Sequence, residues 1–214
     1  MIVWLNGTHG VGKTTTSALV QQLIPSSRVF DAEMVGEMLM RIEPGLPETD
    51  NFQHWPPWRP LVVETARRLL EYTGGNLVVP MTVLVEPYWR EIRTGLEQYG
   101  IPLRHFVLHA DRDTLRSRIE DDRVMGYSTF RIDHLDAYAA AARTWLHDEA
   151  EVVDTTNLAP EEVARQIAGA VAGVDSSVDD LAALIRSQHG QSVPPLPKHL
   201  GGRPCPVIDF GDDP

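Results

Sequence analysis

Residues 7–14 of this 214-residue chain read GTHGVGKT, which fits the pattern of a glycine, four residues and then Gly-Lys-Ser/Thr. An apolar stretch over residues 2–6 precedes them, and a helical pattern over residues 13–23 follows. Glycines in such a loop let successive backbone N–H groups turn inward on a phosphate, and the amino end of the following helix adds about half a positive charge. The order strand, glycine-rich loop, helix is that of a P-loop unit, and it restricts the chain to folds built on such a unit.

The P-loop, as we call residues 7–14, predicts contacts with ATP and Mg²⁺. Lys13 should reach the β- and γ-phosphates, and the Thr14 hydroxyl should ligate Mg²⁺. Only Lys13 and Lys198 are lysines in a chain with 19 basic residues, and a compact ammonium group fits a backbone cradle where a guanidinium would be too broad. A glycine-rich turn without a ligand is the alternative. The residues expected to hold the nucleotide are Gly7, His9, Gly10, Val11, Gly12, Lys13, Thr14 and Thr15.

Strand-length apolar stretches alternate with helical patterns up to residue 173. Strands are expected over residues 2–6, 28–30, 76–80, 103–109 and 151–153, and helices over 13–23, 32–42, 61–72, 87–99, 134–147 and 160–172. The alternation predicts an α/β fold of the P-loop kinase-like kind, with a central parallel sheet of about five strands, helices on both faces and a lid. Residues 1–173 should form this domain. Residues 174–214, with a helix over 179–188 and a Pro/Gly-rich end, should form a partly disordered tail.

The composition narrows the class of partner. A net charge of -11 argues against nucleic acid as a partner for the whole surface. The longest apolar run, residues 137–142, is far shorter than the ~20 residues that a transmembrane helix needs. Cys205 is the only cysteine, so no internal disulfide is expected, and residues 1–4 do not read as a secretory signal. We therefore expect a cytoplasmic protein with a small-molecule substrate, whose oligomeric state the sequence leaves open.

Two acidic residues, Asp31 and Glu33, follow the second expected strand. Residues 78–82 at the end of the third strand contain no acid, whereas switch GTPases and motors usually have an aspartate there to hold the Mg²⁺ water shell. The carboxyl ends of parallel strands meet at one crevice, which brings Asp31 and Glu33 near the γ-phosphate. One carboxylate could serve Mg²⁺ and the other the acceptor hydroxyl, an arrangement that resembles small-molecule kinases of the shikimate and gluconate type. The alternative for Asp31 is a helix N-cap, and the two roles can coexist.

A charged helix over residues 111–123 follows the fourth strand and has the character of a kinase lid. Leu115, Arg118 and Arg123 fit the spacing of lids that cover a nucleotide, and such arginines can neutralise the charge on a transferring phosphoryl group. The alternative is a solvated helix face. After the fifth strand, Thr155 and Asn157 occupy the position where related kinases place a wall against adenine. His105 and His109 share one face of the fourth strand, where packing is favoured over metal binding.

Taken together, these motifs resemble the bacterial tunicamycin-resistance proteins of the P-loop class. The resemblance covers most of residues 1–172. It is carried by MIVWLNG at residues 1–7, Phe52-Gln53 with Pro57-Trp58-Arg59, VPMT at residues 79–82, and Leu115 with Arg118. It implies ATP binding and protection against tunicamycin, a uridine-containing nucleoside antibiotic with a fatty acyl chain.

The aromatic residues between positions 44 and 60 supply a candidate substrate wall. Ligand sites are largely apolar with a few placed polar groups. The proposed wall contains Phe52, His54, Trp55, Trp58 and Met81, with Arg59 and Thr82 as polar groups. The alternative is that the tryptophans cap the core under a long loop.

Two functions remain open. The protein could be an ATP-dependent kinase that phosphorylates a hydroxyl of the drug or of a related nucleoside or sugar, or it could bind ATP and sequester the drug without chemistry. Asp31, Glu33 and the lid arginines favour phosphoryl transfer, because sequestration needs neither a base nor a clamp for transition-state charge.

Overall fold

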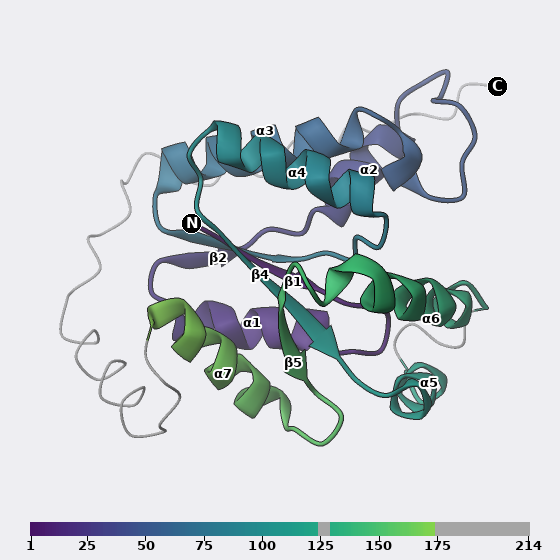
Figure 1. Ribbon diagram of the computed structural model, residues 1–214. Helices are drawn as coiled ribbons and strands as arrows, with labels where there is room; N and C mark the ends of the chain where they lie inside the picture. Colours follow the sequence, from purple (N-terminus) through teal and green to yellow (C-terminus); the bar gives the residue numbers. More distant parts are fainter. Residues whose placement is uncertain (124–128, 174–214) are drawn as a thin grey trace.

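The computed structural model describes residues 1–123 and 129–173. Five strands form one parallel sheet in the order β2-β3-β1-β4-β5 (Figure 1). Their bounds are β1 Ile2–Asn6, β2 Ser27–Val29, β3 Asn76–Pro80, β4 Leu103–His109 and β5 Glu151–Asp154. Strand β1 lies between β3 and β4, with Leu5 beside Pro80 and Phe106. The chain therefore has the expected P-loop kinase-like α/β fold, with the P-loop at the carboxyl end of the central strand.

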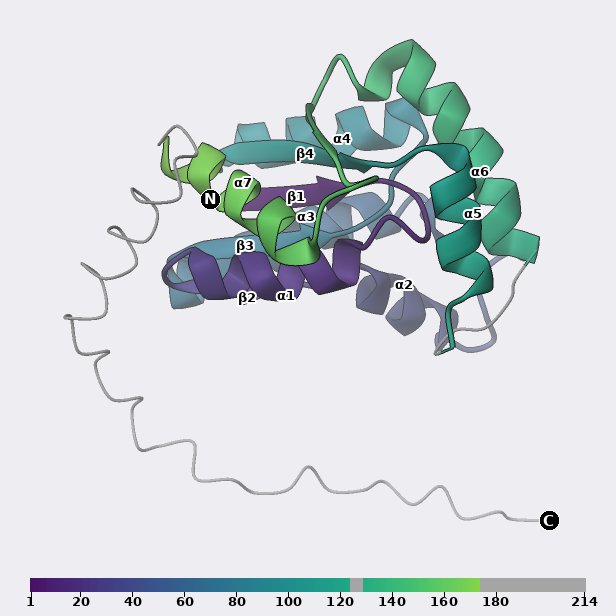
Figure 2. The same ribbon diagram turned by 90° about the horizontal axis from the view of Figure 1, so that it is seen from below.

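Helices cover both faces of the sheet. Helices α1 (Lys13–Leu23) and α7 (Pro160–Ala172) pack together on one face, and α3 (Trp58–Thr73) and α4 (Glu86–Gln98) pack together on the other (Figures 1 and 2). Helix α2 (Glu33–Met40) and a short 3-10 turn, η1 (Phe52–His54), adjoin α3. Helices α5 (Arg112–Glu120) and α6 (Thr129–Ala141) lie side by side beyond the carboxyl end of the sheet, and a π-helical turn, η2 (Ala142–Leu146), continues α6.

Several helix bounds differ from the expectations. Helix α3 begins at Trp58 rather than at residue 61, because Pro57 and Pro60 are compatible with the first turn of a helix. The helix expected over 134–147 begins earlier, at Thr129, and ends in the π turn. Helix α2 is shorter at both ends than residues 32–42. The helix expected over residues 179–188 lies outside the described residues.

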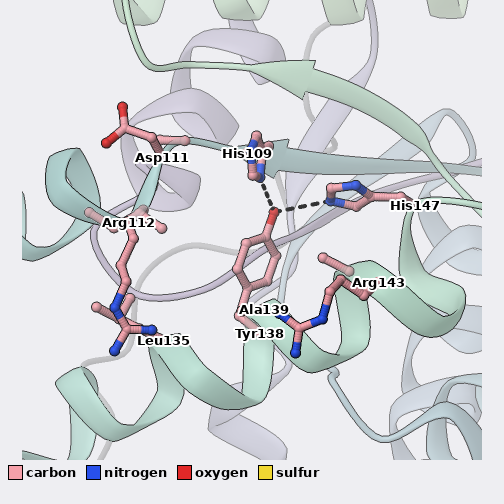
Figure 3. Close-up of a pocket in the computed structure, with 11 residues that line it drawn as sticks. His109, Asp111, Arg112, Leu135, Tyr138, Ala139, Arg143 and His147 are labelled. Carbon is pink, nitrogen blue, oxygen red and sulfur yellow. Dashed lines mark hydrogen bonds between the residues drawn. The ribbon is translucent and has the colours of Figure 1, made fainter.

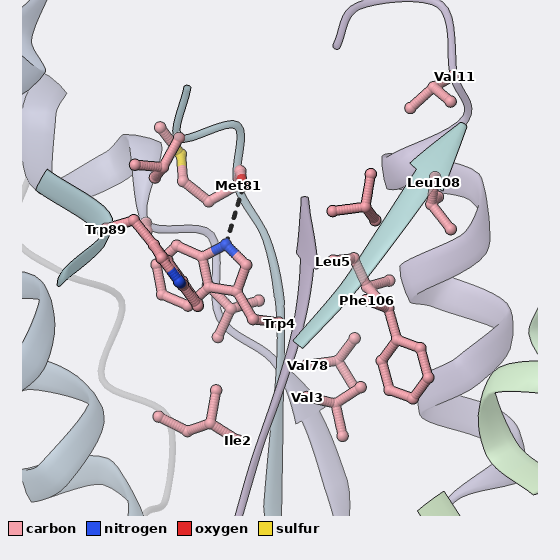
Figure 4. Packing of buried hydrophobic residues seen from close by; sticks show 14 of the residues in the cluster. Ile2, Val3, Trp4, Leu5, Val11, Val78, Met81, Trp89, Phe106 and Leu108 are labelled. Atoms are coloured by element: carbon pink, nitrogen blue, oxygen red, sulfur yellow. Dashed lines mark hydrogen bonds between the residues drawn. The ribbon is translucent and has the colours of Figure 1, made fainter. Parts of the chain in front are cut away.

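Aromatic packing anchors the centre of the core. Trp4 on β1 is buried, packs edge-on against Trp89 of α4 at 5.3 Å between ring centroids, and donates from Nε1 to the Met81 carbonyl oxygen at 3.0 Å (Figure 4). His105 packs on Trp89 with ring centroids 3.9 Å apart and donates from Nδ1 to the Glu149 carbonyl oxygen. Burial lowers the pKa of His105 to about 4, so it is a neutral packing residue at neutral pH.

None of the helices in the described part of the chain has the length and apolar character that a membrane span requires.

Candidate active site

The P-loop is held in place by the last residue of β1. Asn6 is buried, and its Oδ1 accepts from the backbone N–H groups of Gly7 at 2.8 Å and Val83 at 2.9 Å, while its Nδ2 donates to the Val83 carbonyl oxygen. Thr82 donates from Oγ1 to the Gly7 carbonyl oxygen at 2.7 Å. The two sequence motifs WLNG and VPMT are therefore hydrogen-bonded to each other, and together they fix where the P-loop begins.

Close approach and backbone conformation require the P-loop glycines. A Cβ on Gly7, whose φ is +132°, would lie 2.6 Å from the Leu108 carbonyl oxygen. A Cβ on Gly10, at φ +77°, would lie 2.9 Å from the carbonyl oxygen of Leu115 on α5. The P-loop therefore packs closely against the backbone of β4 and of α5. No described side chain caps the start of α1, so its first N–H groups are available to a ligand at the P-loop.

Lys13 lies over the P-loop that precedes it. Its Nζ donates to the carbonyl oxygens of Gly7 at 3.1 Å and Thr8 at 2.8 Å. Burial lowers the pKa of Lys13 to about 8, and the Glu33 carboxylate opposes this shift. Burial, followed by the charge of Lys13, lowers the pKa of His9 to about 3, so the His9 ring is neutral at neutral pH. That ring packs edge-on against His134 of α6, with centroids 5.4 Å apart.

A cavity of about 520 Å³ opens above the P-loop, and we call it the P-loop cavity. Its floor is the P-loop and the start of α1, including the exposed Thr14 and Thr15. Asp31 and Glu33 line the same cavity, so the structure brings together the acids and the lysine that the sequence singled out. Burial raises the pKa of Glu33, and the neighbouring Asp31 raises it further.

Asp31 also has a local structural role, although the N-cap of α2 is Ala32 and not Asp31. Its Oδ1 accepts from the Glu33 backbone N–H at 3.0 Å, at the start of α2. One carboxylate oxygen is therefore used by the helix, and the side chain still lines the cavity.

The lid contributes two arginines to the cavity, one expected and one not. Arg118 on α5 donates from Nη2 to the Thr155 carbonyl oxygen at 2.8 Å and from Nη1 to the Thr155 hydroxyl at 3.2 Å. Arg131 on α6 lines the cavity as well and forms an ion pair with Asp122 at 2.7 Å. Arg123 is exposed and lies outside the described lining of the cavity.

Sequence reasoning missed Arg131 because it placed the start of this helix at residue 134. Because α6 begins at Thr129, Arg131 is part of the helix and lies on the same face as His134, three residues further along. His134 is the residue whose ring packs against His9. Of the two residues expected at the adenine wall, Thr155 is buried and bound to Arg118, whereas Asn157 is exposed.

The expected substrate wall is placed differently by the structure. Trp58 is fully buried and donates from Nε1 to the Ala32 carbonyl oxygen at 3.2 Å, and Phe52 packs on its ring. Met81 is also a core residue. Arg59 is buried and is bound to the Glu91 carboxylate at 2.5 Å. These residues serve the core and its polar anchors, as in the alternative reading.

The remaining wall residues have structural partners too. Trp55 is half-buried and donates from Nε1 to the Pro47 carbonyl oxygen, and His54 is exposed. The Thr82 hydroxyl is bound to the P-loop, as described above, and the Thr82 carbonyl oxygen accepts from Gln53 Nε2 at 2.8 Å. None of the seven wall residues is in the described lining of the P-loop cavity, whereas Asp31 and Glu33 both line it.

Comparison with protein families agrees with this geometry. The profile described as AAA domain matches residues 2–142, which span β1, the P-loop, the acids after β2 and most of the lid. The chain belongs to the AAA domain family. No curated protein sequence matches the chain.

Solved structures place this member of the family more narrowly. The tunicamycin resistance protein of Deinococcus radiodurans is 28% identical, with a TM-score of 0.67 over 81% of this chain and 96% of that one. A sugar kinase from a Janibacter species is 18% identical, with a TM-score of 0.57 over 86% of this chain and 96% of that one. A gluconokinase from Sinorhizobium meliloti is 20% identical, with a TM-score of 0.54 over 89% and 97%. The expected resemblance to a tunicamycin-resistance protein is confirmed, and the two kinases share the fold.

Proposed function

We propose that the protein is an ATP-dependent kinase that phosphorylates a hydroxyl group of tunicamycin, or of a related nucleoside or sugar, and thereby confers resistance to the drug. The observation that carries the proposal is the lining of one cavity by Lys13, by the acids Asp31 and Glu33, and by the lid arginines Arg118 and Arg131. At about 520 Å³ the cavity is within the ~300–1,000 Å³ range of ligand pockets.

The residues present fit ATP and Mg²⁺. The start of α1 offers N–H groups to phosphate oxygens, and Lys13 is already directed over the loop. The exposed Thr14 hydroxyl and the Asp31 carboxylate are oxygen ligands of the kind that Mg²⁺ prefers, and these residues would hold it. When bound, the ion would neutralise charge on the phosphate oxygens.

The two acids divide the remaining work. In the transfer, an oxygen of the acceptor forms a bond to the γ-phosphorus, the bond between that phosphorus and the bridging oxygen of ADP breaks, and the acceptor loses its proton. We assign Glu33 as the acceptor of this proton, because its raised pKa makes it the better base at neutral pH. Asp31, which lines the same cavity, serves Mg²⁺ and its water shell.

The lid arginines meet the other requirement of phosphoryl transfer. Charge spreads over the transferring group, and preorganised cations stabilise it. Arg118 and Arg131 come from different helices, so they can approach the phosphates from two directions. A protein that only sequesters the drug would need neither these cations nor a base.

Growth of tunicamycin-sensitive bacteria tests the proposed role in cells. Cells that express the protein should tolerate the drug, and cells that express Lys13→Ala should not. Phosphorylation adds about -1.5 to -2 charge, and a pocket that accepts the uncharged drug would have to bury that charge. Equal sensitivity with the wild-type protein and with an empty vector would reject tunicamycin as the substrate, and survival of resistance in Lys13→Ala would reject the kinase mechanism.

A further inference from the structure

A second cavity lies farther along the lid helices, toward the amino end of α5 and the carboxyl end of α6. It has a volume of about 320 Å³ and is bounded by α5, α6, the π turn η2 and the end of β4 (Figure 3). Its lining shares no residue with the P-loop cavity. We call it the lid cavity. Its apolar surface comes from Ala110, Leu115, Leu135, Ala139 and Ala142, and three of these five are alanines, which leave room for a ligand.

One wall of the lid cavity is a hydrogen-bonded chain of three rings. The buried Tyr138 hydroxyl lies 2.8 Å from His109 Nδ1 and 3.3 Å from His147 Nε2, and Figure 3 shows it pointing between the two histidines. Burial raises the pKa of Tyr138, so the phenol is neutral. Burial, with the nearby His109, lowers the pKa of His147, which favours a neutral ring there as well.

The hydrogen bonds among these three rings leave one donor and one acceptor unused on the two histidines. A phenol has a single hydrogen, so Tyr138 donates to one histidine and accepts from the other. In neutral rings, the histidine that donates to Tyr138 keeps an acceptor on its second nitrogen, and the other histidine keeps a donor. Neither His109 Nε2 nor His147 Nδ1 is hydrogen-bonded to a described residue. A hydroxyl group, which both donates and accepts, matches either nitrogen.

The charged groups around the lid cavity are largely used within the protein. Arg112 is ion-paired with Asp136, and Asp111 accepts from the backbone N–H and the hydroxyl of Thr114. Arg143 is exposed and makes no hydrogen bond or ion pair with a described residue. It follows Ala142, the first residue of the π turn, and single π turns within helices are frequent at functional sites.

We propose that the lid cavity is a second small-molecule site, which binds an uncharged compound with a compact apolar body and one hydroxyl group. The body contacts the leucines and alanines, and the hydroxyl group binds the free nitrogen of His109 or His147. Binding at the lid cavity does not depend on the proposed kinase reaction. The same two helices nevertheless line both cavities, because α5 carries Leu115 and Arg118, and α6 carries Leu135 and Arg131.

Binding of 2-naphthol to the full chain tests the proposal. In ¹H–¹⁵N NMR titrations, 2-naphthol should bind saturably and shift the amide signals of residues that line the lid cavity. Naphthalene should bind roughly 2- to 12-fold more weakly, which is the range expected for one hydrogen bond. The anion 2-naphthoate should also bind more weakly than 2-naphthol. Absence of saturable binding, shifts centred on the P-loop, or a preference for 2-naphthoate through Arg143 would overturn the proposal.

Two variants locate the compound. Ala139→Phe fills the cavity and should abolish binding of 2-naphthol, whereas the matched control Ala140→Phe, one residue along at an exposed position, should leave it unchanged. Tyr138→Phe keeps the shape of the cavity and removes the hydroxyl that orders the two histidines. It should reduce the preference for 2-naphthol over naphthalene, because the two imidazole rings lose the hydrogen bonds that orient them. This variant tests the proposal even if Ala139→Phe lowers the melting temperature. Equal losses in both alanine variants, or an unchanged preference in Tyr138→Phe, would contradict the assignment.

Discussion

The lining of the P-loop cavity includes backbone groups, hydroxyls and charged side chains, whereas Phe52 and Trp58 from residues 44–60 pack into the protein. Lys13 from the P-loop and Arg131 from α6 both line the cavity. Trp58 and Arg59, by contrast, are buried and bound to protein partners. The comparison teaches that aromatic residues close to a site in sequence need not be its walls. It also predicts that the two regions respond to mutation in opposite ways, one through activity and the other through stability.

The largest expected effect is that of Lys13→Ala on ATP binding and turnover. Among the described residues, Nζ bonds to the P-loop carbonyl oxygens of Gly7 and Thr8, and we propose that this side chain serves a ligand. Its removal should therefore abolish ATP-dependent activity and leave the melting temperature nearly unchanged. Isothermal titration with ATP and thermal melting, run on the same preparation, measure both. A well-folded variant that binds ATP like the wild type would contradict the assignment of Lys13 to nucleotide binding.

Asp31→Asn should impair turnover far more than ATP binding. Asparagine retains an oxygen that can accept from the Glu33 backbone N–H, so the start of α2 is preserved, but the negative charge is lost. We expect a loss of ~10²- to 10³-fold in kcat, the range seen when one preorganised group that stabilises the transferring charge is removed. Activity within a factor of about three of the wild type would reduce Asp31 to its structural role.

The lid offers a matched pair of arginines. Arg131→Ala should lower kcat by about 10²-fold, because it removes a preorganised cation from the cavity. Arg123→Ala, which changes an exposed arginine outside the described lining, should have little effect. Steady-state kinetics of the two variants shows which of the two arginines contributes to kcat. The reverse order would show that the sequence-based choice of Arg123 was right and that the lid rearranges during the reaction.

The smallest expected effect on activity is that of Trp58→Phe. This change removes the hydrogen bond to the Ala32 carbonyl oxygen and should cost about 1–3 kcal/mol of the free energy of unfolding. The activity of the folded protein should remain within about threefold of the wild type, because the ring does not line the cavity. Denaturant unfolding and kinetics on one sample measure both quantities. An unchanged free energy of unfolding together with a large rise in KM would show that Trp58 contacts the substrate.

The same contrast explains what the sequence could predict. The fold and the P-loop follow from local patterns: β1, α1 and the glycines are contiguous, and their spacing alone implies their geometry. Asp31 and Glu33 could be placed because parallel strands bring their carboxyl ends to one edge. Arg131 and the burial of Trp58 could not be found in this way. They depend on where α6 starts and on how α3 packs on α2, which are properties of tertiary packing.

Phosphoryl transfer to the drug can be measured by mass spectrometry of tunicamycin after incubation with the 214-residue protein, ATP and Mg²⁺. We expect a drug product heavier by one phosphoryl group, formed together with an equal amount of ADP, and no such product with Lys13→Ala or with Mg²⁺ chelated. Recovery of unmodified drug from a wild-type protein that binds both ATP and tunicamycin would contradict phosphoryl transfer and leave sequestration as the explanation of resistance.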